Sequence, residues 1–235
     1  MQPPFLINPN FVVKTLHVGN ERQAVVVIDD FVQDPRSMVE FAAQVQFGGP
    51  LTHYPGPIAP LPKQYVMNVV RAVNPLVREA FGFPTDQVKV ECCYYGLATI
   101  RPEQLNIRQR HPHADAVNAG QLAVLHYLCD ESHGGTAFYR HRETGYESMD
   151  EQQYARYTQL VQKDMDEHGV VPAEYITTHN RLYEQTAAVE AKFNRAVIYR
   201  GRLLHSASIA PAANFSPDPR KGRLTANTFL TYRCP

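Results

Sequence analysis

Three sequence features that are typical of nucleic-acid-binding, membrane and secreted proteins are missing from this chain. The 23 basic side chains are balanced by 23 acidic ones, so no net charge attracts the chain to DNA, RNA or an anionic membrane. No apolar run approaches the roughly 18 to 20 residues that span a bilayer, and the N-terminus lacks the basic start and apolar stretch of a signal peptide. We therefore expect neither nucleic-acid nor membrane partners.

Cysteine is also scarce. The four cysteines include no Cys-x-x-Cys pair. Cys92 and Cys93 are adjacent in a strand-like run, where neighbouring side chains point to opposite faces. We therefore expect neither a zinc ribbon nor a disulfide scaffold, and reduced thiols predict a cytoplasmic protein.

Length and apolar content predict one elaborated domain over residues 1–235, because 44% apolar residues can form a full core. Its first part, residues 24–83, begins with a β-branched run at 24–30 that predicts a buried strand. Asp34 and Pro35 then have the character of an N-cap and a first helical turn. The sequence therefore predicts a strand followed directly by a helix.

The rest of this first part is predicted from apolar spacing and from breakers. Apolar residues at helical spacing continue the helix through Val45, and the stretch Gly48-Gly49-Pro50 ends it. The proline-rich residues 52–62 predict a loop without regular structure, and residues 64–81 predict a second helix that is interrupted near Pro75.

The remaining chain is strand-rich on both sides of a helical insertion, with a core formed by residues 84–146 and 191–235. Strands are predicted at 88–100, 110–116, 121–128, 137–140, 195–199, 202–210 and 223–232. Residues 147–190 turn helical, with a charged amphipathic segment at 150–168. The predicted fold is α+β, an antiparallel sheet or jelly roll with N-terminal helices and one helical insertion. We expect the insertion to be a substrate lid, with a packing buttress or a homodimer face as alternatives.

The most informative residues are His113, Asp115 and His205. On the predicted strand 110–116, residues i and i+2 share a face, so His113 and Asp115 should project into one cavity. His205 follows a glycine turn at Gly201, early on another predicted strand. Two imidazoles and one carboxylate can hold one face of an octahedral ferrous ion, which leaves the opposite face open for a co-substrate and dioxygen.

Arg223 completes this constellation. Residues 214–222 have the composition of a turn, so His205 and Arg223 should lie on consecutive antiparallel strands. Arg223, Thr225 and Asn227 then share one strand face, where a guanidinium and a hydroxyl could bind a dicarboxylate such as 2-oxoglutarate. The alternatives are that Arg223 pairs with an acid at the turn, or that Arg220, expected to be solvated, binds the carboxylate instead.

Two further stretches carry a family resemblance. Residues 122–128 (Leu-Ala-Val-Leu-His-Tyr-Leu) and 134–138 (Gly-Gly-Thr-Ala-Phe) resemble the region after the His-x-Asp motif in prolyl-4-hydroxylase-like, Fe(II)- and 2-oxoglutarate-dependent oxygenases. Residues 26–31 (Val-Val-Ile-Asp-Asp-Phe) are also similar to members of that superfamily. With residues 139–145 included, the chain looks like an uncharacterised bacterial family within it.

This resemblance implies a double-stranded β-helix, cupin-like, with iron held by His113, Asp115 and His205. It implies that Arg223 binds the distal carboxylate of 2-oxoglutarate, assisted by Thr225 and by the hydroxyl of Tyr127. The implied reaction is hydroxylation of a small-molecule or peptide substrate by dioxygen, with release of succinate and carbon dioxide. The substrate stays open. The longer gap created by the insertion departs from the family pattern, as does the missing acidic residue after Gly134-Gly135-Thr136.

Two alternatives come from other classes. His111-Pro112-His113-Ala114-Asp115 also reads as the His-x-His-x-Asp motif of metallo-β-lactamase-type hydrolases, although Ala116 stands where a second histidine should follow. A cupin-like module that binds metal and an oxoacid without turnover would have the same ligands. We expect His111 at the pocket rim or on the surface, and residues 139–142 either near the substrate or at a solvated strand end.

Overall fold

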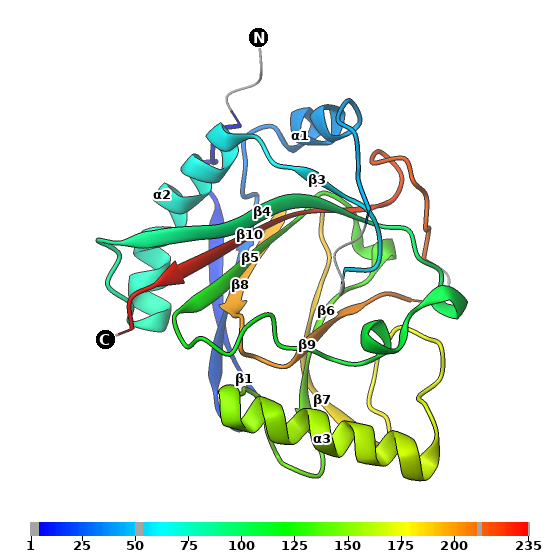
Figure 1. The fold of residues 1–235 in the computed structure, drawn as a ribbon. Coiled ribbons are helices and arrows are strands. Elements are labelled where there is room, and N and C mark those ends of the chain that lie inside the picture. The colour runs from blue at the N-terminus through cyan, green and yellow to red at the C-terminus, as the bar shows by residue number, and fades with distance from the viewer. Residues whose placement is uncertain (1–4, 50–53, 211–212, 235) are drawn as a thin grey trace.

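The computed structural model describes residues 5–49, 54–210 and 213–234, and within them the strands form two antiparallel sheets (Figure 1). The larger sheet has the strand order β1-β2-β8-β5-β10-β4-β3 and the smaller has the order β7-β6-β9. The strands of the larger sheet are β1 (Val12–Val18), β2 (Gln23–Asp29), β3 (Ile58–Pro60), β4 (Val88–Ala98), β5 (Gln121–Tyr127), β8 (Arg195–Arg200) and β10 (Arg223–Tyr232). Those of the smaller sheet are β6 (Gly135–His141), β7 (Tyr183–Glu190) and β9 (His205–Ser208).

Three α-helices accompany these sheets in the described chain. They are α1 (Pro35–Ala42), α2 (Lys63–Phe81) and α3 (Glu151–His168), with short 3-10 turns at Pro102–Gln104, Ile107–Arg110 and Glu131–His133. Helices α1 and α2 lie against the larger sheet, and α3 lies beside the smaller one (Figure 1). The α+β class predicted from the sequence is confirmed. No helix of the described chain has the length and apolar character needed to cross a membrane.

Strand β2 shows how the layers are built from the sequence. Val26 and Ile28 pack in the core that α1 and α2 share with the larger sheet, whereas Val25 and Val27 pack in a second core with Phe138 of β6. Alternate residues of a strand point to opposite faces. Both faces of β2 are therefore buried, and the two sheets face each other across the second core. This double burial explains the uninterrupted β-branched run in the sequence.

Helix α1 begins where the sequence predicts it but ends earlier than predicted. The Asp34 carboxylate accepts a hydrogen bond from the Ser37 amide at 3.1 Å, and proline occupies the first helical turn. The helix ends at Ala42 and does not continue through Val45, because the chain must turn to bring Gly48 into an isolated bridge with Ile58. Pro50, part of the predicted stop, lies outside the described residues.

Two further predictions in this region were wrong. Helix α2 continues without interruption through Pro75, because Val69, Val73 and Val77 are fully buried along one side, and this burial offsets the lost backbone hydrogen bond. Residues 58–60, predicted as loop, form the short edge strand β3, which pairs with β4. Proline is tolerated on such an edge because it need not donate to the ladder. Thr52 and His53 of the predicted loop lie outside the described residues.

The insertion at 147–190 is only partly helical. It contains α3, but its last residues form β7, which pairs with β6 in the smaller sheet. Strand β7 contains two alanines and two glutamates among its eight residues, so its local composition conceals a strand that long-range pairing imposes. Tyr157 and Val161 of α3 pack against Ala137 and Leu204, so the helix is fastened to the smaller sheet.

The predicted strand at 110–116 is absent. Ile107–Arg110 form a 3-10 turn, and the following segment joins the smaller sheet only through an isolated bridge between His113 and His205. Strands β9 and β10 also differ from the prediction, because β9 pairs with β6 whereas β10 pairs with β4 and β5. His205 and Arg223 therefore lie on facing sheets and not on paired strands.

Candidate active site

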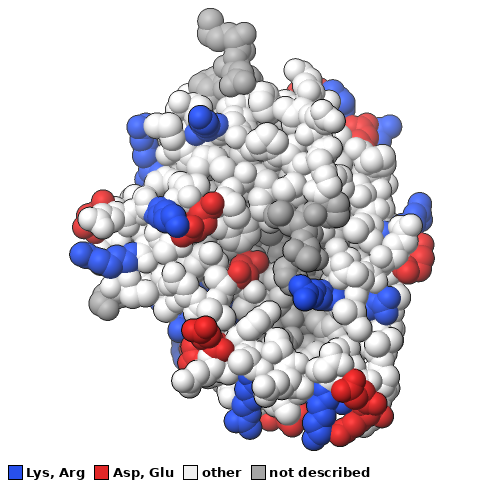
Figure 2. All heavy atoms as spheres, viewed as in Figure 1, with Lys and Arg blue, Asp and Glu red and all other residues white. Residues whose placement is uncertain are grey.

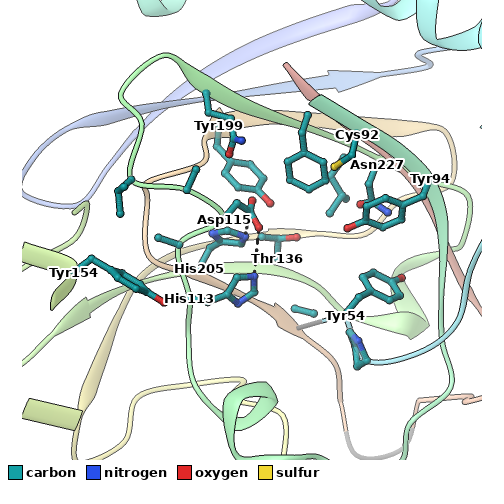
Figure 3. A pocket seen from close by; sticks show the side chains of 18 of the residues that line it. Tyr54, Cys92, Tyr94, His113, Asp115, Thr136, Tyr154, Tyr199, His205 and Asn227 are labelled. Carbon is teal, nitrogen blue, oxygen red and sulfur yellow. Dashed lines mark ion pairs between the residues drawn. The ribbon is translucent and has the colours of Figure 1, made fainter. Parts of the chain in front are cut away.

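His113, Asp115 and His205 come together between the two sheets (Figure 3). One ligand atom from each lies within 4.8 Å of the other two. The Asp115 carboxylate lies between the imidazoles, with Oδ1 3.5 Å from His113 Nε2 and Oδ2 3.4 Å from His205 Nε2. His113 and Asp115 therefore form one cluster with His205, which lies about 90 positions later in the sequence.

Backbone hydrogen bonds, and not a regular strand, hold the ligand segment in place. The His113 amide donates to the His205 carbonyl at 2.8 Å, and the His205 amide donates back to the His113 carbonyl at 2.9 Å. The Asp115 amide donates to the Gly201 carbonyl at 2.7 Å. The segment is thus anchored to β9 and to the turn before it, which places both of its ligand side chains beside His205.

The protonation of His205 suits a divalent metal. Its Nδ1 lies 2.8 Å from the Leu203 carbonyl, so Nδ1 carries the proton and Nε2 keeps a lone pair facing Asp115. Burial lowers the pKa of His205 to about 4, which keeps the ring neutral near pH 7. Two imidazole nitrogens and one carboxylate are the donor set that ferrous iron accepts in non-haem oxygenases. The residues present therefore fit such an ion.

A cavity of about 520 Å³ adjoins this cluster. Its wall is mostly uncharged and includes four tyrosines and a phenylalanine, with Tyr94, Tyr199 and Asn227 seen on one side of the cluster and Tyr154 of α3 on the other (Figure 3). The residues that line it are Tyr54, Pro55, Cys92, Tyr94, His113, Ala114, Asp115, Ala116, Val117, Gln121, Leu125, Thr136, Tyr154, Tyr199, His205, Ala207, Arg223, Asn227 and Phe229. The face drawn in Figure 2 is hollowed near its centre, and acidic and basic side chains are scattered over it without a patch of one sign.

Arg223 brings a buried positive charge to the same cavity. It is 3% exposed, and its guanidinium donates from Nε to the His133 carbonyl at 3.2 Å and from Nη2 to the Gly135 carbonyl at 2.9 Å. Within the described chain no carboxylate forms an ion pair with it, so the predicted alternative of an acid at the turn is not observed. A side chain on Gly134 would collide with the Ser208 carbonyl, which explains the glycine beside this loop.

Arg220, the rival for the same role, is excluded by its position. Its side chain is 47% exposed and lies 2.7 Å from the Glu40 carboxylate, on the outside of the molecule. It does not line the cavity. Of the two arginines near the turn, only Arg223 lines the cavity that adjoins the metal cluster.

Thr225 and Tyr127 lie one layer behind the cavity wall. The Tyr127 hydroxyl is 2.6 Å from Thr136 Oγ1, and the Thr225 hydroxyl is 3.2 Å from the Tyr54 hydroxyl. Thr136 and Tyr54 line the cavity, whereas Tyr127 and Thr225 do not. Direct contact of Tyr127 and Thr225 with a co-substrate stays a prediction.

Several cavity residues were missed from the sequence. Tyr54 lies in a proline-rich segment without a periodic signal, and Tyr94 and Phe229 looked like ordinary strand residues. The rings of Tyr94 and Phe229 stack with centroids 6.0 Å apart, and Tyr54 meets Tyr94 edge-on at 5.9 Å. Asn227, by contrast, was placed on the strand face of Arg223 from the sequence; it lines the cavity, and its amide donates to Thr225 Oγ1 at 3.0 Å.

Other predicted contacts are absent from the cavity. His111 is buried, not at the rim or on the surface, and its Nδ1 lies 2.9 Å from the Tyr183 hydroxyl. None of residues 139–142 lines the cavity. Arg140 instead pairs with Glu147 at 2.6 Å and with Glu184 at 3.1 Å. These side chains stabilise the smaller sheet and its connections.

Comparison with solved structures shows a shared fold. The chain is similar to the non-heme alpha ketoglutarate dependent carbocyclase SnoK from nogalamycin biosynthesis, with 13% identity over 89% of this chain and 79% of that one and a TM-score of 0.50. It is also similar to HygX from Streptomyces hygroscopicus, solved with nickel and 2-oxoglutarate bound, with 10% identity over 89% and 83% of the two chains and a TM-score of 0.49. At such identities the likeness to SnoK shows the fold alone, and the prolyl-4-hydroxylase-like grouping stays a prediction.

Sequence comparison identifies a family for this chain but no curated relative. A search of curated proteins finds no match. The model of one family, described as a family of unknown function (DUF6445), matches residues 9–230. Because that match spans almost the whole chain, the protein belongs to the DUF6445 family.

Proposed function

We propose that this protein is a non-haem Fe(II)- and 2-oxoglutarate-dependent dioxygenase that hydroxylates a C–H bond of a small-molecule or peptide substrate, with release of succinate and carbon dioxide. One observation carries the proposal. A buried guanidinium, Arg223, and a two-histidine, one-carboxylate cluster line the same cavity, and the described chain supplies no acid to neutralise the guanidinium. A buried charge is costly without a partner, so this site calls for an anionic ligand beside a metal.

The proposed roles follow from position. His113, Asp115 and His205 would hold the iron from one side and leave its other side toward the cavity. Arg223 would bind the distal carboxylate of 2-oxoglutarate through the N–H groups that the His133 and Gly135 carbonyls leave free. When bound, iron and 2-oxoglutarate together supply the oxidising power for C–H cleavage.

The remaining side chains would orient the reactants and exclude water. Tyr54 is tied to Thr225, and Thr225 to Asn227, so these polar groups form one network beside Arg223. Tyr94 and Phe229 would present an aromatic wall to the substrate. A largely apolar wall strengthens electrostatic interactions inside the cavity and limits entry of water.

The proposal extends to the fold. Two facing antiparallel sheets with the metal cluster between them are the arrangement expected of a double-stranded β-helix, and the likeness to SnoK supports this assignment. The hydrolase alternative loses support, because His111 bonds to Tyr183 and does not join the metal cluster. A cupin-like binding module would have the same ligands and differs only in turnover.

The test is made in oxygen-free buffer. Fe(II) and 2-oxoglutarate are added to the purified protein, and the visible metal-to-ligand charge-transfer band is recorded. We expect the band in the unmodified protein and its loss in His205→Ala and Asp115→Ala, with Arg220→Met as a matched surface control that keeps it. Absence of the band at saturating 2-oxoglutarate would refute the proposal. If the band forms but admission of oxygen yields no succinate, the binding module is the correct function.

A further inference from the structure

A closed chain of buried hydrogen bonds lies directly behind the metal cluster, outside the cavity. The Tyr157 hydroxyl is 2.9 Å from the Pro112 carbonyl and 2.8 Å from the Tyr183 hydroxyl. The Tyr183 hydroxyl is in turn 2.9 Å from His111 Nδ1. Two tyrosines of the insertion, one on α3 and one on β7, therefore contact the two residues that immediately precede His113.

Donor counting sets the direction of every bond in this chain. A carbonyl cannot donate, so the Tyr157 hydroxyl donates to Pro112, and its single proton is then used. The Tyr183 hydroxyl must donate to Tyr157, and His111 Nδ1–H must donate to Tyr183. The chain runs from the ring of His111 through two hydroxyls to the carbonyl of its neighbour Pro112.

The donor count places a proton on His111 Nδ1, 2.9 Å from the Tyr183 hydroxyl. The protonation of the two tyrosines agrees with this direction. Burial raises the pKa values of Tyr157 and Tyr183, so both hydroxyls keep their protons. Each group is buried, and breaking a bond of the chain would leave a further buried polar group unsatisfied, which favours one geometry. His111 Nε2, at the end of the chain, has no hydrogen-bond partner among the described residues.

The ligand segment needs this support because it is not a strand. Backbone hydrogen bonds tie His113 and Asp115 to β9 and Gly201. Residues 111 and 112 belong to no strand, so no sheet hydrogen bonds fix the direction of their backbone. The same helix also reaches the cavity, since Tyr154, three residues before Tyr157, lines it. The insertion thus contacts both the metal-binding segment and the space for substrate.

We propose that Tyr157 and Tyr183 are positioning residues that set the direction of His113 toward the metal, so that the insertion completes the metal centre instead of serving only as a lid or a buttress. This inference rests on the proposed function, because it requires that His113 binds a metal. Outer groups that orient metal ligands typically change metal affinity by about 10- to 100-fold when removed.

The chain offers a matched control. Tyr139 is fully buried in the same apolar cluster as Tyr157, and its hydroxyl donates to the Ile176 carbonyl, also at 2.9 Å. Tyr139→Phe and Tyr157→Phe therefore both remove a hydrogen bond from a tyrosine hydroxyl to a carbonyl in the same core, and Tyr157→Phe also breaks the bond with Tyr183. Only the second frees a carbonyl next to a proposed metal ligand.

The experiment titrates each protein with Co(II) in oxygen-free buffer and records the visible d–d absorption, which reports ligand geometry, while thermal unfolding checks the fold. We expect Tyr157→Phe to raise the Co(II) Kd about tenfold and to alter the d–d bands, whereas Tyr139→Phe changes neither. Tyr183→Phe keeps the bond to Pro112 and should raise the Kd less, which provides a second test if Tyr157→Phe fails to fold.

The outcomes separate the two proposals. If the unmodified protein binds no Co(II), the proposed function fails and this inference with it. If the unmodified protein binds Co(II) but folded Tyr157→Phe has the same Kd and the same bands, the positioning role is overturned while the function stands. Equal weakening in Tyr157→Phe and Tyr139→Phe would also overturn it, because the effect would then come from a loosened core.

Discussion

The role of Arg223 can be tested by removing its charge and varying the ligand at the same time. Of its five guanidinium N–H groups, one on Nε and one on Nη2 donate to the His133 and Gly135 carbonyls, and the guanidinium also interacts with the Tyr54 hydroxyl. The remaining N–H groups are available to a ligand. Truncating one member of a buried, hydrogen-bonded charge pair costs about 2–5 kcal/mol. For Arg223→Met we therefore expect the Kd of 2-oxoglutarate to rise about 100-fold, since 1.4 kcal/mol corresponds to a factor of ten.

The comparison ligand is 2-oxobutyrate, which has the same chelating end and lacks the distal carboxylate. Affinities of both ligands are measured from the charge-transfer band of the anaerobic Fe(II) protein. The unmodified protein should prefer 2-oxoglutarate strongly, and Arg223→Met should lose most of that preference while its affinity for 2-oxobutyrate changes little. Such a double comparison isolates the interaction between the arginine and the carboxylate from general effects on the fold.

Two controls accompany this measurement. Arg220→Met removes a solvated guanidinium near the same turn and should leave both affinities unchanged. Arg223→Lys keeps the charge and loses the planar fork, so it should fall between the two other proteins. If Arg223→Met weakens both ligands equally, or neither, while the protein stays folded and binds Fe(II), the assignment of Arg223 to the distal carboxylate is refuted.

Three further predictions concern stability. Fe(II) at about 100 times its Kd should raise the free energy of unfolding by about 2.7 kcal/mol. Differential scanning calorimetry in oxygen-free buffer should show the higher Tm, and an equal rise in His205→Ala would contradict the ligand assignment. Burial lowers the pKa of His126 from 6.5 to about 4, so on acidification the unfolded chain takes up the proton first. The free energy of unfolding should therefore fall by about 3 kcal/mol between pH 6.5 and pH 4. Urea unfolding of His126→Leu should show a shallower fall over that range, and an unchanged slope would speak against a buried neutral ring. The hydrogen bond from Arg195 holds the pKa of Asp29 below its usual value. The ionised carboxylate therefore stabilises the fold above the usual pKa of an aspartate, and this stabilisation is lost as the pH falls through the folded pKa. Asp29→Asn should cost on the order of 1 kcal/mol at pH 7, and a difference from the unmodified protein that persists at pH 2 would contradict the role of the ionised carboxylate.

Local chemistry predicted the elements whose residues act within a few positions of one another. The cap at Asp34 and Pro35 and the buried strand β2 follow from side chains that satisfy nearby backbone groups or fill two apolar layers. Helix α2 shows the limit of such reasoning. A proline predicts an interruption, but the fully buried valines on either side of Pro75 outweigh the missing hydrogen bond.

For the site, residue types and their order were sufficient to single out His113, Asp115, His205 and Arg223 as candidates, because their side chains carry the chemistry that binds a metal and a carboxylate. Their arrangement was not predictable from the sequence. The expected strand around His113 does not form, and His205 and Arg223 lie on facing sheets. The cluster assembles through reciprocal backbone bonds between segments that are distant along the chain, and no local pattern encodes such bonds.

The sequence by itself thus determined which groups could bind a metal and an anion, since that depends on the chemistry of the side chains. Only the tertiary structure decided what surrounds them. It placed Tyr54 and Phe229 in the cavity, and it brought Tyr157 from the insertion to the Pro112 carbonyl. The physical reason is that a hydrogen bond or a ring contact between distant residues depends on how the sheets pack, and packing is a property of the whole chain.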